Sequence, residues 1–155
     1  EKVEPRIDTE IDLLIKGYIP NEYVPDLNQR LELYRRIQMI GSTKECFELS
    51  REIIDRFGPY PESVEKLMAL LEIRVLCQLL HIAKAKIKNR ELILTLLPTT
   101  SLNNQILNPL FDESFRLISE FKIRILLDRQ GWRLDCKVIL NYLQKLSHAL
   151  TSKEV

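Results

Sequence analysis

The sequence has few of the residues and none of the motifs that enzymes and membrane proteins usually require. Its 155 residues include only 4 glycines, 3 cysteines and 1 tryptophan. There is no glycine-rich phosphate loop followed by Lys-Ser/Thr, no Gly-x-Ser-x-Gly and no His-Glu-x-x-His, which argues against the common nucleotide, acyl-transfer and zinc-protease sites. No apolar run reaches the roughly 18 residues that a membrane-spanning helix needs, and no signal segment opens the chain. We therefore expect a cytoplasmic, non-catalytic chain with no membrane partner, metal or cofactor of its own.

The cysteines and histidines also give no evidence of chemistry. Cys46, Cys77 and Cys136 lie far apart in apolar segments and lack the short pair spacing of a zinc site. We predict that they are reduced, buried thiols. His81 and His148 have no nearby carboxylate or cysteine that would complete a ligand set, so each is interpreted as a satisfied or solvent-facing side chain rather than a general base.

The composition is typical of one globular domain. The chain is 45% hydrophobic and 29% charged, which is sufficient to bury a core. Its formal net charge of +1 argues against a dedicated nucleic-acid binder, because such proteins usually carry a basic excess over a whole face. Residues 1–10 have little periodicity and are predicted to be a linker from upstream sequence, followed by a single domain over residues 11–155.

The first half of the chain is predicted to be mostly helical. Alternation of apolar and polar residues over 11–15 favours a short strand with one buried face. The segment 18–26 is stiffened by prolines and is predicted to dock on the core. Asp26 has the features of an N-cap, so a helix is expected to begin at Leu27, and Ser42 starts a second helix by the same pattern. The predicted buried stripe of the first helix consists of Leu27, Leu31, Tyr34 and Ile37.

A rigid corner is expected between the second and third helices. The last apolar turn of the second helix is predicted to consist of Ile53, Ile54 and Phe57, and Gly58 follows at a C-cap position where a left-handed residue is favoured. Pro59 prevents the helix from continuing. Pro61 is well placed at the start of the third helix, where its missing N–H costs nothing.

The second half of the chain is predicted to contain strands and a terminal helix. A period of two over residues 83–97 indicates a hairpin, and 102–119 is assigned to short helices around a proline. A second hairpin is predicted from strands at 121–127 and 132–138, followed by a last helix at 139–150. The expected fold is therefore α+β, with three N-terminal helices packed on a small antiparallel sheet of hairpins and a C-terminal helix.

An acidic stripe is expected on the solvent side of the second helix. Its residues recur at helical spacing and are Glu45, Glu48, Glu52 and Asp55. Glu52 has Arg56 at the favourable i, i+4 spacing, whereas Asp55 has only Arg51 in the weaker reverse order. Most acidic faces are simply solvated, but residual negative charge on a rigid element also suits a basic partner.

A basic hairpin face is the other charged surface. It is predicted to consist of Lys84, Lys86, Lys88, Lys122, Arg124, Arg133 and Lys137. Such a face could contact nucleic-acid phosphates. We favour a solvated face whose lysines protect strand edges, because no aromatic residue is interleaved for stacking on bases.

Three runs of residues resemble a known family. They are Tyr18-Ile-Pro-Asn-Glu-Tyr-Val-Pro-Asp26, Arg30-Leu-Glu-Leu-Tyr-Arg-Arg-Ile37 and Glu52-Ile-Ile-Asp-Arg-Phe-Gly-Pro59. In order and spacing they are similar to the C-terminal domain of the bacterial transcription-repair coupling factors, known as Mfd. The resemblance extends from about Ile11 to Ile82, where His81 departs from the more common glycine. The motif residues singled out as structural are Tyr18, Pro20, Tyr23, Pro25, Asp26, Arg30, Tyr34, Arg56, Phe57, Gly58 and Pro59.

The resemblance implies a regulatory role. Members of that family are ATP-driven DNA translocases that displace stalled RNA polymerase and recruit UvrA, and their ATP- and magnesium-binding motor would lie upstream of residues 1–10. Their C-terminal domain packs on a UvrB-like module of the same protein, masks its UvrA-binding surface and restrains the motor. The resemblance places this interdomain contact on Glu52 and Asp55, beside Glu48. The alternative is an independent nucleic-acid-binding module that uses the basic hairpin face.

Overall fold

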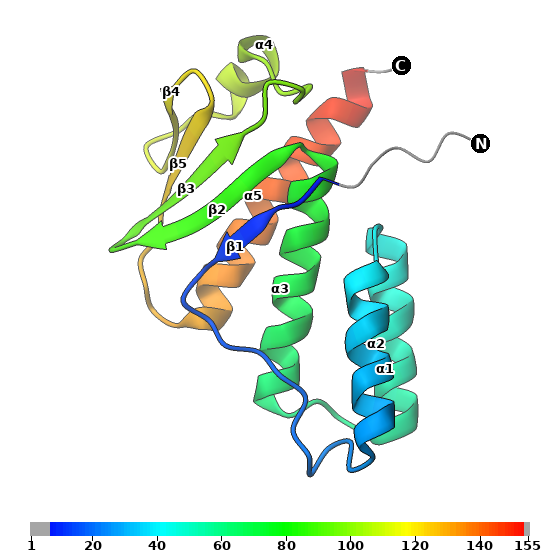
Figure 1. The fold of residues 1–155 in the computed structure, drawn as a ribbon. Coiled ribbons are helices and arrows are strands. Elements are labelled where there is room, and N and C mark those ends of the chain that lie inside the picture. The colour runs from blue at the N-terminus through cyan, green and yellow to red at the C-terminus, as the bar shows by residue number, and fades with distance from the viewer. Residues whose placement is uncertain (1–6, 154–155) are drawn as a thin grey trace, which may run out of the picture. The chain divides into compact units, whose positions relative to one another are not determined.

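The computed structural model describes residues 7–153 and has α+β architecture, as the sequence predicts (Figure 1). The elements, in chain order, are β1 (Glu10–Asp12), α1 (Leu27–Met39), α2 (Thr43–Phe57), α3 (Glu62–Leu79), β2 (Ile82–Lys88), β3 (Glu91–Leu96), α4 (Asn104–Leu107), the 3-10 helix η1 (Asn108–Leu110), β4 (Phe115–Ser119), β5 (Lys122–Leu126) and α5 (Trp132–Lys153). None of the helices described over 7–153 is long and apolar enough to cross a membrane.

The chain divides into two compact units. The helical unit comprises Ile15–Val75, and the sheet unit comprises the residues up to Leu14 together with those from Leu76 onward. The division falls within α3. The prediction of a single domain over 11–155 stays a prediction.

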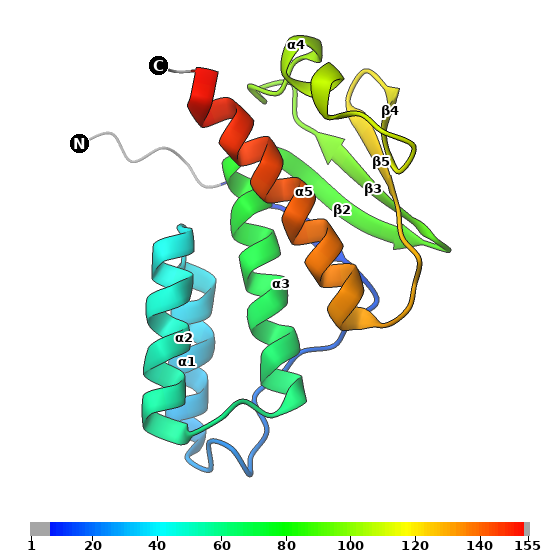
Figure 2. The same ribbon diagram turned by 180° about the vertical axis from the view of Figure 1, so that it is seen from behind.

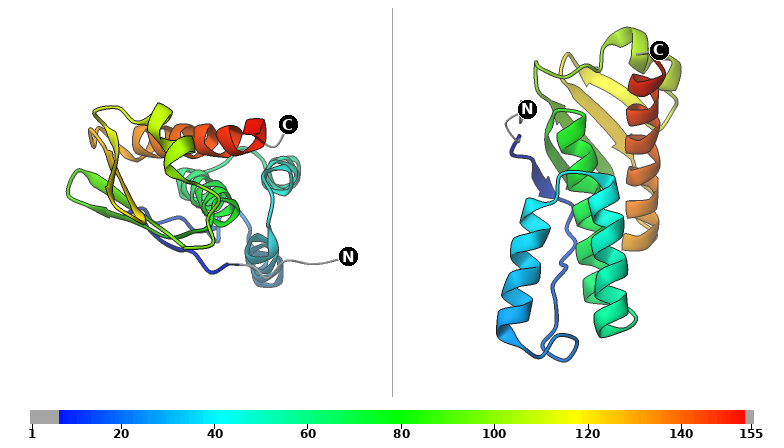
Figure 3. Two further views of the ribbon diagram at one scale, coloured as in Figure 1. Left: turned by 90° about the horizontal axis from the view of Figure 1, so that it is seen from above. Right: turned by 90° about the vertical axis from the view of Figure 1, so that its right-hand side faces the viewer.

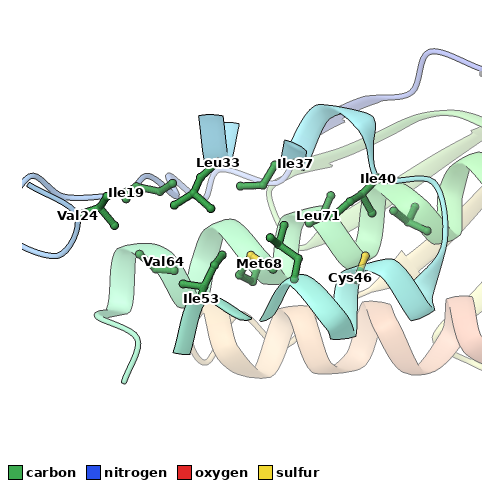
Figure 4. Packing of buried hydrophobic residues seen from close by; sticks show 12 residues of the cluster. Ile19, Val24, Leu33, Ile37, Ile40, Cys46, Ile53, Val64, Met68 and Leu71 are labelled. Carbon is green, nitrogen blue, oxygen red and sulfur yellow. The ribbon is translucent and has the colours of Figure 1, made fainter. Parts of the chain in front are cut away.

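In the helical unit, α1 and α2 run antiparallel beside each other (Figures 1 and 3). Their inward side chains enclose a core with the first part of α3 (Figure 4). This core includes Ile19, Val24, Leu33, Ile37, Ile40, Cys46, Leu49, Ile53, Val64, Met68, Leu71 and Val75. The docking of segment 18–26 is thus confirmed, because two of its side chains lie in the core.

The predicted buried stripe of α1 is only partly correct, because Ile37 is buried and Tyr34 packs against the core but Leu27 and Leu31 do not. Leu27 and Leu31 are 58% and 57% exposed, whereas Leu33 and Ile37 are buried. Helix α1 carries two apolar stripes, and the one that faces inward continues at i+7 into the buried Ile40 just beyond the helix. The exposed pair, Leu27 and Leu31, is not continued by a buried residue just beyond the helix. Packing against the other helices therefore determines which apolar side of α1 is buried.

Helix α2 begins and ends as predicted. The Ser42 hydroxyl accepts a hydrogen bond from the Glu45 N–H at 3.1 Å, as an N-cap does, and donates one to the Glu45 carboxylate at 3.0 Å. Gly58 ends the helix with φ +91° and ψ −171°, and its N–H donates to the Ile54 carbonyl at 2.8 Å. This backbone conformation is essentially restricted to glycine. The Pro61 carbonyl then accepts the first hydrogen bonds of α3.

The sheet unit contains five strands in the order β1-β2-β3-β5-β4. β1 pairs parallel with β2, and the remaining neighbours are antiparallel. Helix α5 covers one face of the sheet (Figure 2). That face buries cross-strand rows such as Ile87, Leu92, Ile125 and Phe115, and Phe115 stacks on Tyr142 of α5 with ring centroids 5.0 Å apart.

Three strand predictions require correction. The first strand occupies Glu10–Asp12 rather than 11–15, because Leu14 adopts φ +59° and ends it. The first hairpin is confirmed as β2 and β3, and short helices do form around Pro109, which lies in η1, but residues 115–119 form β4 instead of helix. The second hairpin is therefore β4 and β5.

Residues 132–138, predicted to be a strand, form the start of α5. Their apparent alternation is misleading, because Leu134 and Val138 are 49% and 37% exposed. The buried residues instead follow helical spacing, at Cys136, Ile139, Leu143 and Leu146. Arg129 pairs with the buried Asp135 in the first turn of α5 at 2.9 Å.

The cysteine prediction is confirmed. All three thiols are free and buried. Burial raises the pKa of Cys46 to about 11, of Cys77 to about 12 and of Cys136 to about 11. They are structural residues, because the reactive thiolate is suppressed at neutral pH.

Candidate functional site

The motif residues bind segment 18–26 to the helices of the helical unit. The Tyr23 hydroxyl donates to the Gly58 carbonyl at 2.5 Å, which joins the segment to the corner after α2. The Tyr34 hydroxyl of α1 accepts a hydrogen bond from the Ile19 N–H at 2.8 Å. Within the segment, the Pro20 carbonyl accepts from the Tyr23 and Val24 N–H groups, both at 3.1 Å. These bonds fix the segment against α1 and against the corner that follows α2.

Arg30 and Asp26 hold the end of the segment at the start of α1. The Arg30 guanidinium donates to the Val24 carbonyl at 2.7 Å and to the Pro25 carbonyl at 3.0 Å. The Asp26 carboxylate accepts from the Gln29 N–H at 3.1 Å, as its predicted N-cap role requires. Together they satisfy backbone groups on both sides of the helix start.

The beginning of the segment lies close to α3. The Tyr18 N–H donates to the Ser63 carbonyl at 3.1 Å, although the Tyr18 side chain is 54% exposed. Gly17 approaches α3 so closely that an added Cβ would lie 2.3 Å from the Leu67 amide nitrogen. Glycine is therefore required there for backbone contact, which the sequence did not reveal.

Aromatic and cationic contacts stiffen the corner itself. The Tyr23 and Phe57 rings lie 5.9 Å apart at 56°, and the Arg56 guanidinium lies 4.8 Å from the Phe57 ring centroid. The Tyr60 hydroxyl donates to the Ser50 carbonyl at 3.0 Å. Pro59 is exposed between them. All these residues have structural roles. The motif residues therefore explain how α2 is held in place, and they do not identify what α2 binds.

Glu52 is the most strongly bound member of the acidic stripe. Arg36 of α1 donates to its two carboxylate oxygens at 2.5 and 2.8 Å, and Arg56 donates at 3.1 Å. The hydrogen bond from Arg36 is the main reason why the pKa of Glu52 falls to about 2. The sequence identified Arg56 but missed Arg36, because this pair is separated by 16 residues and joins two helices.

The other members of the acidic stripe differ in their compensation. Glu45 caps α2, and Glu48 lies 3.9 Å from Lys44 in a weak, exposed ion pair. Asp55 is exposed and makes no ion pair with any residue of 7–153. The predicted weak partner, Arg51, instead lies over the Phe47 ring at 5.8 Å from its centroid. The uncompensated charge is thus concentrated at Asp55.

Exposed apolar side chains lie beside this charge. Phe47 is 63% exposed and Ile54 is 42% exposed, although Ile54 had been assigned to the apolar turn facing the core. Helical spacing places these two on one flank of the solvent side of α2, Glu48 and Asp55 on the other, and Arg51 between them. We call these five residues the α2 outer face. Aromatic residues and arginine are enriched at protein interfaces, and the rim of an interface is polar.

The predicted basic hairpin face is only partly assembled. Lys84, Lys86 and Lys88 lie on β2, and Lys122 and Arg124 lie on β5 of the same sheet, with β3 between the two strands. Arg133 and Lys137 lie on α5 and are not part of a hairpin, which corrects their assignment. Among residues 7–153 no cluster of three or more histidine, cysteine or acidic side chains could hold a metal ion.

Comparisons with known proteins converge on one family. A family model described as the TRCF domain matches residues 13–107. The transcription-repair-coupling factor of Bacillus subtilis is 40% identical over 70 residues, which are 45% of this chain and 6% of that protein. The Staphylococcus epidermidis protein of the same name is 31% identical over 102 residues, or 63% of this chain and 9% of that one. The Buchnera aphidicola protein of the same name is 27% identical over 140 residues, which are 88% of this chain and 17% of that protein.

A solved structure gives the same result for the fold. It is titled the crystal structure of the C-terminal domain of transcription-repair coupling factor. It matches with a TM-score of 0.83 and 19% identity over 96% of this chain and 97% of that chain. The chain spans less than a fifth of the length of the curated relatives it matches.

Proposed function

The chain belongs to the TRCF domain family, and from this premise we propose that it is a non-catalytic, regulatory C-terminal domain of a transcription-repair coupling factor. In this proposal the α2 outer face packs on a UvrB-like module of the same protein. The contact masks the UvrA-binding surface of that module and restrains the motor until RNA polymerase is engaged. The observation that carries the proposal is an exposed carboxylate, Asp55, which makes no ion pair within residues 7–153 and lies on a helix held rigidly at both ends.

The rigidity of α2 supports the docking role. Its N-terminus is capped by the Ser42 hydroxyl, and its C-terminus is fixed through the Gly58 carbonyl to the Tyr23 hydroxyl. A preformed face loses little conformational entropy when it binds, so more of the interaction energy appears as affinity. The exposed Phe47 and Ile54 supply apolar area that docking would remove from water.

The carboxylates supply selectivity for arginine or lysine on the partner. Asp55 is the strongest candidate, because its charge is uncompensated within the described chain. An ionised carboxylate offers about four acceptor positions. At Glu52, hydrogen bonds from Arg36 and Arg56 already occupy three of these positions. Glu52 can therefore accept one further donor while it keeps α1 and α2 together. Hydrogen bonds to charged groups contribute about 1.5–3 kcal/mol each, so two such contacts would move a closed–open equilibrium by a factor of about a hundred or more.

Other components of the proposed function lie outside this chain. ATP and magnesium would bind the motor of the parent protein, and DNA and RNA polymerase would be engaged by its other domains. The parent protein is expected in the cytoplasm. Within this chain, the proposal requires only the docking surface.

The experiment is a double substitution, Glu48→Ala with Asp55→Ala, in the full-length protein. Both side chains are exposed, so folding should be retained. UvrA binding and ATP turnover without polymerase should both rise, because the closed form is weakened. A matched control is Glu113→Ala with Glu120→Ala, which removes the same charge from exposed positions in the sheet unit. Unchanged UvrA binding and turnover in a folded Glu48/Asp55 variant would contradict the proposal.

A further inference from the structure

The face of the sheet opposite α5 carries a concentrated array of cations. Residues paired directly across antiparallel strands point to the same face, so the register decides which side chains meet. One row runs Lys86, Ile93, Arg124, Arg116 across β2, β3, β5 and β4. The next row includes Lys84, Thr95 and Lys122. We define the basic sheet face as Lys84, Lys86, Lys88, Arg116, Lys122 and Arg124.

This array differs from the face predicted from sequence. It excludes Arg133 and Lys137, which lie on α5, and adds Arg116, because residues 115–119 form a strand. Arg116 and Arg124 are direct cross-strand partners. Like charges in that position destabilise a sheet. An anion placed between them would remove the repulsion.

Acidic neighbours compensate only part of the charge. Glu10 lies 3.6 Å from Lys84, Glu91 lies 4.0 Å from Arg124, and Asp12 is the register partner of Lys86. The cations that form no ion pair within residues 7–153 are Lys86, Lys88, Arg116 and Lys122. In addition, the Arg124 Nε is buried and has no hydrogen-bond acceptor in the described structure. The face therefore has donors and positive charge that the chain itself does not satisfy.

We propose that the basic sheet face contacts the phosphate backbone of a nucleic-acid duplex without reading its sequence. The cations are fixed on hydrogen-bonded strands, with about 4.8 Å between strands and about 6.8 Å between alternate residues along a strand. Such an array can neutralise several phosphates of one backbone at once. The outward positions of β2, β3, β4 and β5 that the register assigns to this face hold no aromatic side chain. The absence of aromatic side chains argues against stacking on single-stranded bases.

This contact is separate from the proposed regulatory docking. All six cations lie in the sheet unit, whereas the α2 outer face lies in the helical unit. The two functions can therefore be tested independently with substitutions in different units.

The test measures binding of the wild-type chain and two variants to a fluorescein-labelled 20-base-pair DNA duplex by fluorescence anisotropy. The test variant is Lys86→Glu with Lys122→Glu. The control is Arg133→Glu with Lys137→Glu, which changes the net charge equally but lies on α5. At 50 mM salt the test variant should lose at least about tenfold in affinity and the control less than about twofold. The slope of log affinity against log salt should fall in magnitude by about 2 in the test variant, at about 0.9 per lost phosphate contact.

Several outcomes would overturn the proposal. Equal losses of duplex affinity in the test and control variants would show that net charge, rather than the basic sheet face, determines binding. If the chain bound a 20-nucleotide single strand more tightly than the duplex, the proposal that the ligand is a duplex would be wrong. If it bound phosphatidylserine vesicles but not the duplex, the basic sheet face would be a membrane-binding surface instead. Circular dichroism verifies folding, and Lys86→Gln with Lys122→Gln replaces the test variant if the reversed charges prevent folding. With this neutral variant, an affinity equal to that of the wild-type chain would also refute the contact.

Discussion

Replacing Glu52 with alanine should weaken the helical unit itself, apart from any effect on docking. Its carboxylate is held by Arg36 of α1 and Arg56 of α2, and this binding lowers its pKa from 4.5 to about 2. At about 1.36 kcal/mol per pKa unit, the full shift would correspond to about 3 kcal/mol of stability. Because the Glu52 side chain is 37% exposed, solvent screening reduces this. We expect Glu52→Ala to lower the free energy of unfolding by about 1 kcal/mol at pH 7.

The pH dependence gives an independent check on this magnitude. A carboxyl whose pKa is lowered on folding stabilises the protein fully above its unfolded pKa, and the contribution is lost as the pH falls through its folded pKa. For Glu52 that window extends from about pH 5 down to about pH 2. The difference in unfolding free energy between the wild-type chain and Glu52→Ala should therefore shrink progressively below pH 5. Other carboxylates titrate in both proteins and cancel in the difference.

The assay is urea unfolding followed by circular dichroism at 222 nm, with Arg36→Ala and the Arg36/Glu52 double variant completing a cycle. The coupling free energy between the two residues should be about 0.5–1 kcal/mol at pH 7. A coupling near zero, or a Glu52→Ala difference that stays constant from pH 7 to pH 3, would refute the assigned ion pair.

Three further predictions concern the contacts that hold segment 17–26 and the corner after α2, and a fourth concerns the buried cysteines. Tyr23→Phe should lower the free energy of unfolding by about 1 kcal/mol, because it removes the hydrogen bond to the Gly58 carbonyl; thermal melting measures this. Gly58→Ala should cost about 1–3 kcal/mol through backbone strain alone, since nothing lies within 4 Å of the added Cβ. Gly17→Ala should cost more, because its Cβ would collide with the Leu67 backbone, and equal losses in the two glycine variants would contradict this distinction. The three cysteines should stay unreactive toward a thiol reagent at pH 7.5 in the folded chain and react in urea, since burial raises each pKa to about 11 or 12.

The sequence was most informative where local chemistry determines local structure. The caps at Asp26 and Ser42 and the break at Gly58 were predictable, because a side-chain acceptor or a missing Cβ acts on its own backbone. The hairpin at residues 82–96 also followed from its period of two. The α+β class and the C-terminal helix could be inferred from these signals.

The sequence was less informative where a choice depends on distant partners. Leu27 and Leu31 of α1 face solvent although Ile37 of the same predicted stripe is buried, because burial depends on which side of the helix meets the other helices. Residues 132–138 alternate as a strand would, but the strand beside β5 is supplied by residues 115–119. The ion pair from Arg36 to Glu52 links two helices and leaves no pattern at local spacing. At the candidate site, the acidic stripe was predictable, whereas the exposed Phe47 and Ile54 beside it required the fold.

The most direct test of the regulatory proposal is the affinity of this chain for a separately produced UvrB-like module from the same parent protein, measured by isothermal titration calorimetry. The account predicts a complex that Asp55→Ala weakens at least about tenfold, that Glu113→Ala leaves unchanged, and that UvrA displaces. A complex of unchanged affinity in Asp55→Ala, or one that binds UvrA without releasing this chain, would contradict the docking of α2 over the UvrA-binding surface.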